Sequence, residues 1–303
     1  LWLNKEIPES RKAKHFLSAP EWVAYCLGAE LVNELSLVSR TGFFDVEART
    51  PWREAMALVG GGDDFLARLV VAGEPIGVVN NEAPEVLRGA VITIAGHDHF
   101  TAAYYCGAIN EGSLFDSMGT AEALLRTFKK PLSRDAIAEL AAANVGLSCS
   151  VIADHFTLLG ALPTGLTLER VCSLVGVSTR DEKVALGEAA LKIDPSASAM
   201  RVVNDYHGLS VTNLDDAVSP AALFRATTEH LIEDSAAMVG LIEKFTGKAS
   251  EVVIAGGWIK NPMIASAKNK QFGSYKVSDA TEAGATGAAQ FAGIAAGIFK
   301  LKI

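Results

Sequence analysis

Two short stretches of the sequence combine residue types that could carry chemistry. Gly96-His97-Asp98-His99 follows an apolar run, and a second turn, Ser117-Met118-Gly119-Thr120, follows further along the chain. A carboxylate between two imidazoles can orient a nucleophile or accept a proton. A turn of small residues lets backbone amides approach an anion. The two turns are therefore candidates for proton transfer and for anion binding.

A third turn has the same design. The apolar stretch 251–255 runs into Gly256-Gly257, so three apparent strands each end in a turn of small residues. In open α/β sheets, ligands bind outside the carboxyl ends of strands, where helix N-termini attract phosphate. Three such turns in one chain predict a nucleotide or a phosphorylated ligand.

The elements that position these turns alternate between strand and helix patterns. We expect strands over 91–95, 113–117 and 251–255, because these runs are apolar or rich in β-branched residues. We expect helices after Ser18, after His99, from Ser219-Pro220 to about 247, and over 283–297. The first of them would have Trp22, Val23, Cys26 and Leu27 on one face. This alternation predicts the α/β class.

The composition limits the functional classes. The 303 residues are 50% hydrophobic and 20% charged, which is typical of a globular enzyme of about two domains. The net charge of -8, without a basic stripe, argues against nucleic-acid binding. The four cysteines form no C-x-x-C pair, so we expect free thiols in a reducing compartment, the cytoplasm.

The two ends of the sequence bear on membrane contact and targeting. The stretch 283–299 is uncharged but rich in Ala and Gly, so a packed helix is expected there and no membrane contact. The start, Leu1-Trp2-Leu3, lacks both an initiator Met and a secretory signal pattern. We therefore expect that the sequence begins within a longer protein.

Five stretches together resemble a known family. They are, in order, "LSLVSRTGFFDVEARTPW", "AGHDHFTAAYYCGA", "DSMGTAEALL", "VVIAGGWIKNP" and "DATEAGATGAAQFAGIAAGIF". They are similar to motifs of the FGGY carbohydrate kinases, members of the sugar kinase, actin and Hsp70 superfamily, over nearly the whole chain. The resemblance implies a ribonuclease-H-like two-domain fold with an incomplete N-terminal domain. Residues 1–113 would be the remainder of the sugar-binding domain and 114–303 the nucleotide-binding domain.

The resemblance also implies an activity. It is the ATP-dependent phosphorylation, with Mg²⁺, of a hydroxyl on a sugar, such as a pentulose or another ketose, or on a polyol. Asp98 matches the family's catalytic carboxylate, which accepts the proton of the attacking hydroxyl. The alternative for Asp98 is a carboxylate that caps the following helix.

Several positions match residues that contact the nucleotide in the family. Gly119 and Thr120 match a phosphate-contacting turn, although Thr120 could also be an ordinary helix cap. The other matches are Gly256, Gly257 and Asn261, and more loosely Gly165 and Glu169 in "ALPTGLTLERV". The helix over 283–297 matches a closing helix that we expect to pack rather than to bind ligand.

Two departures from the family pattern keep other functions open. His99 stands where the family often has Gln or Asn, so His97 and His99 are predicted to contact the substrate. His97, Asp98 and His99 could alternatively ligate a metal in a hydrolase, although in a strand Asp98 would face away from the two histidines. The family's opening Asp-x-Gly-Thr hairpin is absent from the 303 residues. A non-catalytic sugar or nucleotide sensor on the same scaffold is therefore the alternative function.

The sequence determines neither the sugar nor the oligomeric state. A small-molecule sugar or polyol is the expected partner, and a homodimer is kept as a candidate assembly.

Overall fold

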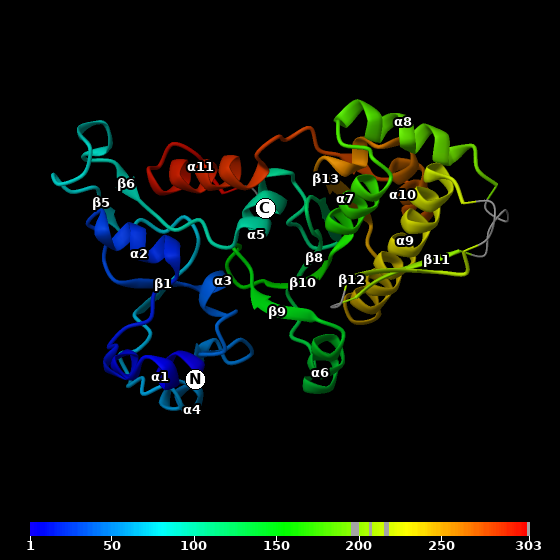
Figure 1. Ribbon diagram of the computed structural model, residues 1–303. Coiled ribbons are helices and arrows are strands. Elements are labelled where there is room, and N and C mark those ends of the chain that lie inside the picture. Colours follow the sequence, from blue (N-terminus) through cyan, green and yellow to red (C-terminus); the bar gives the residue numbers. More distant parts are fainter. Residues whose placement is uncertain (195–199, 206–207, 215–217, 302–303) are drawn as a thin grey trace.

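The computed structural model describes residues 1–194, 200–205, 208–214 and 218–301. A six-stranded mixed sheet in the order β14-β13-β7-β8-β10-β9 lies at its centre (Figure 1). Its strands are β7 (Ser113–Met118), β8 (Glu122–Phe128), β9 (Val145–Cys149), β10 (Phe156–Leu162), β13 (Glu251–Ala255) and β14 (Lys276–Val277). β13 is parallel to β7 and β14, whereas β7, β8, β10 and β9 pair antiparallel in succession.

Helices cover both faces of this sheet. α5 (Asp98–Tyr105) and α11 (Ala283–Ala295) lie on one face. On the other lie α7 (Thr164–Leu174), α8 (Arg180–Leu191), α9 (Pro220–Thr246) and α10 (Pro262–Phe272). The side-chain alternation of the strands serves both cores: Leu114 of β7 packs with the second group of helices, and its neighbour Phe115 packs with the first.

The N-terminal part is built from short elements. They are α1 (Trp2–Glu6), α2 (Ala19–Cys26), β1 (Val32–Glu34), α3 (Leu35–Val38), β2 (Phe44–Asp45), β3 (Thr50–Pro51), α4 (Arg53–Ala57), β4 (Arg68–Val70), β5 (Gly77–Val78) and β6 (Val91–Ile92), with 3-10 turns at Pro8–Lys12 and Glu85–Leu87. The remaining elements are α6 (Arg134–Ala142), the ribbon of β11 (Arg201–Asp205) and β12 (Gly208–Thr212), and a 3-10 turn at Trp258–Lys260.

Most of the expected elements that surround the three turns are confirmed. β7, β13 and α5 lie where the patterns indicated, and Ser219 caps α9 by accepting the Ala222 N–H at 3.1 Å. The predicted strand over 91–95 is wrong in length, because only Val91–Ile92 pair, with the two-residue strand β5. Beyond Ile92 the chain is held by single bonds: Thr93 Oγ1 donates to the Glu74 carbonyl, and Ile94 O accepts from Gly73 N–H.

The predicted apolar face of the helix after Ser18 is also wrong. Trp22 and Val23 are exposed, whereas Glu21 and Ala24 are the buried residues of α2. Glu21 can be buried because its carboxylate accepts the amides of Ser18 and Glu34. Local hydrogen bonding therefore decided which side of this helix turned inward.

The last helix of the chain returns to the helix that begins at Asp98. α11 lies against α5 although residues 106–282 separate them in the sequence (Figure 1). A Cβ on Gly287 would come within 2.2 Å of the Thr101 carbonyl oxygen, so only glycine allows this backbone approach. Tyr104 and Phe291 complete the contact with ring centroids 4.7 Å apart. The helix expected over 283–297 thus packs against α5 and ends at Ala295, while its first residues, Ala283 and Gly284, line a cavity that also contains Asp98.

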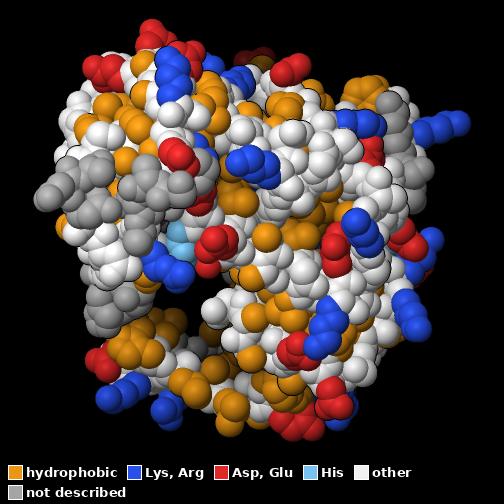
Figure 2. Space-filling view, turned by 90° about the vertical axis from the view of Figure 1, so that its right-hand side faces the viewer, with side chains coloured by type: hydrophobic (Ala, Val, Ile, Leu, Met, Phe, Trp, Pro, Cys, Tyr) orange, Lys and Arg blue, Asp and Glu red, His pale blue; other side chains and the backbone are white. Residues whose placement is uncertain are grey.

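The surface seen from the side of α8 and α9 carries charges of both signs. Figure 2 shows Lys, Arg, Asp and Glu side chains intermingled over the described part of this face. Among the described residues, no helix combines the length and apolar character needed to cross a bilayer.

Candidate functional site

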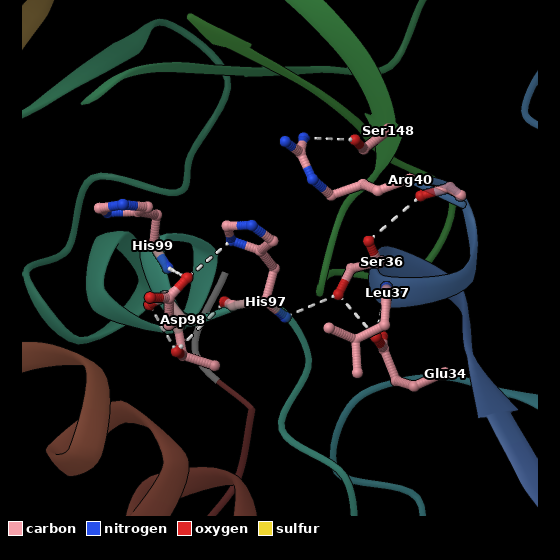
Figure 3. A network of polar contacts seen from close by, with 10 residues as sticks. Glu34, Ser36, Leu37, Arg40, His97, Asp98, His99 and Ser148 are labelled. Atoms are coloured by element: carbon pink, nitrogen blue, oxygen red, sulfur yellow. Dashed lines mark hydrogen bonds and ion pairs between the residues drawn. The ribbon is translucent and has the colours of Figure 1, made fainter. Parts of the chain in front are cut away.

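The Asp98 turn begins at a glycine whose φ lies in the left-handed region, and neighbouring side chains pack closely around it. Gly96 has φ of 90°, and a Cβ there would lie 2.5 Å from Ser36 Oγ and 2.6 Å from Val151 Cγ1. The turn therefore requires glycine. His97 precedes α5 and Asp98 is the first helical residue. The Asp98 side chain is 79% exposed, accepts the His99 N–H at 2.8 Å, and lies 3.0 Å from His97 Nδ1 (Figure 3).

These contacts favour the ionised form of Asp98. The hydrogen bond from His97 is the main reason why the pKa of Asp98 is well below its usual range, and the charge and amide of His99 add to it. Asp98 is consequently a carboxylate at neutral pH. Such a group is a weak base that can orient a hydroxyl and receive its proton late in a reaction.

Nitrogen donors surround this carboxylate. The rings of His97 and His99 stack with centroids 5.8 Å apart, and burial lowers the pKa of His99. Arg40 Nη1 donates to Ser148 Oγ at 3.2 Å (Figure 3). Burial lowers the pKa of Arg40, and the nearby Asp98 charge opposes that shift. His97, His99 and Arg40 therefore place donors on the same side of the turn as Asp98.

A buried glutamate supports the turn from below. Ser36 Oγ accepts the His97 N–H at 2.9 Å and donates to Glu34 Oε2 at 2.6 Å, and this oxygen also accepts the Leu37 N–H. Complete burial raises the pKa of Glu34 to about 7. Sequence reasoning missed Glu34 and Ser36, although a glutamate inside the mostly apolar run 31–38 was an available signal.

A cavity joins the Asp98 turn to the ends of two central strands. It is open to solvent, with about 820 Å³ of empty space, and its lining includes Asp98, His99, Ser117, Gly256 and Glu282. Ser117 belongs to β7, and Gly256 follows β13. The structure thus brings two of the three predicted turns to one cavity, beside the strand that leads to the third.

The third turn, Gly119-Thr120, differs in one respect from the expected design. It connects β7 to β8 in an antiparallel hairpin, so a strand and not a helix follows it. The helix that meets it is α7, whose Leu166 N–H donates to the Thr120 carbonyl at 2.8 Å. A Cβ on Gly165 would lie 1.9 Å from the Gly119 carbonyl oxygen, so Gly165 allows α7 to pack directly on the turn. Both turn residues are exposed.

A second pocket gathers three predicted nucleotide contacts. Glu169, Gly257 and Asn261 come from α7, the turn after β13 and the start of α10, and they line a space of about 770 Å³ with Lys183 and Trp258. Lys183 Nζ lies 2.7 Å from a Glu169 oxygen and 5.6 Å from the Trp258 ring centroid. The pocket therefore combines an aromatic wall with charged groups, a combination suited to a heterocyclic base and its ribose.

Asn261 and Gly256 also stabilise the local backbone structure. Asn261 is 4% exposed; its Oδ1 caps α10 by accepting the Met263 N–H, and its Nδ2 donates to the Lys183 carbonyl at 2.8 Å. Gly256 has φ of 109°, and a Cβ there would lie 2.2 Å from the Met118 carbonyl oxygen. Both residues therefore fix the backbone conformation around the two cavities.

The sequence left a metal site at His97, Asp98 and His99 as an alternative. Within residues 1–194, 200–205, 208–214 and 218–301, no group of three or more His, Cys, Asp or Glu side chains is placed to hold a metal ion. All four cysteines are free thiols, as expected.

Comparison with known proteins shows which proteins the chain resembles. Residues 1–104 match the model of the N-terminal domain of the FGGY family of carbohydrate kinases. The autoinducer-2 kinase of Escherichia coli K12 is 25% identical over 99% of this chain and 60% of its own length. The L-fuculokinase of the same strain is 24% identical over 99% of this chain and 64% of its own length. The chain is therefore similar to FGGY carbohydrate kinases, through the family model over residues 1–104 and through these two relatives over nearly its whole length.

The fold of the chain is similar to that of solved sugar kinase structures. The crystal structure of a ligand-bound xylulose kinase from Lactobacillus acidophilus superposes with a TM-score of 0.83 at 16% identity, covering 99% of this chain and 63% of that one. The expected ribonuclease-H-like fold is confirmed. The chain spans about 60% of the length of the autoinducer-2 kinase that it matches.

Proposed function

We propose that this protein transfers the terminal phosphoryl group of ATP to a hydroxyl of a small sugar or polyol. One observation carries the proposal: the Asp98 carboxylate shares a cavity with Gly256 and Ser117, which adjoin the nucleotide pocket and the strand leading to Gly119-Thr120. A carboxylate that can accept a proton and a glycine turn that can approach an anion thus line the same cavity. The match to the family model and the kinase relatives support the same reaction.

The chemical step balances with the groups at hand. The sugar hydroxyl oxygen attacks the terminal phosphorus of ATP, the bond from that phosphorus to the bridging oxygen breaks, and ADP leaves. The hydroxyl proton passes to Asp98, which His97 keeps ionised until then. Because phosphoryl transfer depends mainly on positioning and charge stabilisation, a weakly basic carboxylate suffices.

The nucleotide would occupy both parts of the surface. Its base and ribose fit the pocket between Trp258, Glu169 and Gly257, where a Cβ on Gly257 would meet open space. Its phosphates would extend toward the Gly256 amide and toward Thr120, because the Gly119 N–H donates within the hairpin to the Ala121 carbonyl at 3.0 Å. The carboxylate of Glu282, which lines the same cavity, provides a hard oxygen ligand of the kind that Mg²⁺ prefers, so it would help to hold a Mg²⁺ that neutralises phosphate charge.

The acceptor that we propose is a ketose such as a pentulose, bound beside His97 and His99. A xylulose kinase shares the fold, and His99 lines the cavity next to Asp98. The free thiols fit the cytoplasm, where ATP is available, as the place of action.

The test is a phosphotransfer assay on a full-length protein with a panel of pentuloses, hexuloses and polyols. Asp98→Asn should lower kcat by about 10²-fold or more and leave the Kd for ATP within about twofold, since only the proton acceptor is lost. Asp154→Asn, which neutralises an exposed carboxylate in an ion pair with Arg49, is the matched control and should keep full activity.

Two results would contradict the proposal. Equal turnover in Asp98→Asn would remove this residue from the mechanism. ATP and sugar binding without turnover in the unmodified protein would favour the sensor function instead.

A further inference from the structure

A buried cluster of charged and polar side chains lies beneath the Gly119-Thr120 hairpin. Glu122, at the start of β8, and Lys268, in α10, are both 0% exposed, and Lys268 Nζ lies 2.6 Å from Glu122 Oε1. Asp116 of β7 is equally buried, with Oδ2 at 2.7 Å from the same ammonium. None of these three residues lines either cavity of the site.

Glu122 connects three helices to the hairpin. Its Oε2 accepts from Thr164 Oγ1 of α7 at 2.7 Å, and its Oε1 accepts from Lys268 of α10 and from Ser235 Oγ of α9 at 2.5 Å. Both carboxylate oxygens are thus satisfied by donors from different elements. A buried carboxylate bound in this way is held firmly, because every lost donor leaves an uncompensated charge.

The ionic state of the cluster agrees with this arrangement. Two carboxylates around one ammonium keep the pKa of Lys268 above its ordinary value despite burial. Burial, with the nearby Glu122 charge, raises the pKa of Asp116 above its ordinary value, whereas the Lys268 ammonium acts to lower it. The Glu122–Lys268 pair therefore joins the hairpin to α10 as a charged unit.

The two helices joined in this way carry parts of the nucleotide pocket. Thr164 immediately precedes Gly165, which packs on the Gly119 carbonyl, and Glu169 lies one turn further along α7. α10 begins at the Asn261 cap. In contrast, α9 contributes Ser235 to the cluster but none of the side chains that line the nucleotide pocket.

We propose that Glu122, bound to Thr164 and Lys268, positions the phosphate turn relative to the two walls of the nucleotide pocket and so determines nucleotide affinity. This inference rests on the proposed kinase function. Glu122 contacts no substrate in this role; it is a positioning residue that acts through the hairpin, α7 and α10.

The experiment compares two hydroxyls that donate to the same carboxylate. Thr164→Val removes the link to α7, and Ser235→Ala removes the link to α9, where Lys268 still keeps its two carboxylate partners. Binding of ADP and of a non-hydrolysable ATP analogue is measured by calorimetry, and unfolding midpoints are measured for each variant. Both changes should lower the midpoint.

Only the α7 link should affect the nucleotide. Thr164→Val should weaken nucleotide binding about tenfold, the order expected from one lost hydrogen bond to a charged group, and raise the KM for ATP without changing that for the sugar. Ser235→Ala should stay within about twofold of the unmodified affinity. Thr164→Ser, which keeps the hydroxyl, should bind nucleotide as the unmodified protein does, and Thr164→Ala removes the same hydroxyl if the valine variant does not fold.

The outcomes separate this inference from the proposed function. Equal nucleotide affinity in Thr164→Val and the unmodified protein, or equal weakening in Thr164→Val and Ser235→Ala, would overturn the positioning role alone. An unmodified full-length protein that binds no nucleotide would overturn the proposed function and this inference with it.

Discussion

Gly165→Ala offers a direct test of how tightly α7 is packed on the Gly119-Thr120 turn. The added Cβ would lie 1.9 Å from the Gly119 carbonyl oxygen and 3.0 Å from that of Thr120. Cβ atoms essentially never approach another atom within 3.0 Å, so the contact must open by about 1.1 Å. Because the obstacle is backbone, no side-chain rotation can relieve it.

The magnitude follows from this displacement. Overpacking of this kind costs about 1–3 kcal/mol of unfolding free energy. A shift of about 1 Å in a positioning element can lower a catalytic rate about 10²-fold. We expect Gly165→Ala to lose kcat/KM for ATP by that order, while the sugar still binds, because the Asp98 turn belongs to other elements. Phosphotransfer kinetics with varied ATP and sugar, and urea unfolding, measure the two effects.

Gly240→Ala is the matched control for this substitution. Gly240 lies in α9, and a Cβ there would meet open space. The same added methyl should raise stability by about 1 kcal/mol, through helix propensity, and leave the kinetics unchanged. If Gly165→Ala retained the ATP kinetics of the unmodified protein, the turn would not contact the nucleotide in the proposed way.

Three further outcomes are expected. His97→Gln removes the main cause of the low Asp98 pKa, so the acidic limb of the kcat/KM profile should move to higher pH; an unmoved limb would exclude Asp98 as the titrating group. Glu34, with a pKa of about 7 when folded against 4.5 as its ordinary value, binds more protons in the folded state, so its contribution to stability falls as pH rises through that range. Glu34→Gln should therefore flatten the pH dependence of urea unfolding by up to about 3 kcal/mol between pH 4.5 and 7, and an unchanged slope would contradict the raised pKa. Asn261→Ala removes the α10 cap and should cost about 1 kcal/mol in thermal unfolding; a midpoint equal to that of the unmodified protein would show that the cap contributes nothing.

The sequence predicted the chemistry-bearing turns better than their surroundings. Asp98, Gly119-Thr120 and Gly256-Gly257 were identifiable because small residues after apolar runs are a local signal. Whether a strand or a helix follows such a turn is not local: Glu122 begins β8 because β10 and β7 pair on both sides of it. The hairpin at Gly119-Thr120 could therefore not be distinguished from a strand-to-helix turn.

The buried residues that support the turns could not be predicted from the sequence, for a different reason. Glu34 and Glu122 are charged, and single-sequence patterns place charged residues at the surface. Their burial depends on donors distant in the chain, since Lys268 meets Glu122 only after α10 has folded back on the sheet. The short β6 likewise reflects its partner, because β5 offers only two residues for pairing. Contacts between residues distant in the sequence therefore determined the burial of these glutamates and the length of β6.

The contact between α5 and α11 affects how chimaeras of this protein and its relatives can be built. Gly287 rests on the Thr101 carbonyl, and Phe291 lies against Tyr104, so each helix is shaped for the other. A hybrid that takes residues 98–105 from one parent and 283–295 from another would bring unmatched surfaces together directly behind Asp98. Gene fragments exchanged between relatives should therefore carry both helices from the same parent, even though they lie far apart in the reading frame.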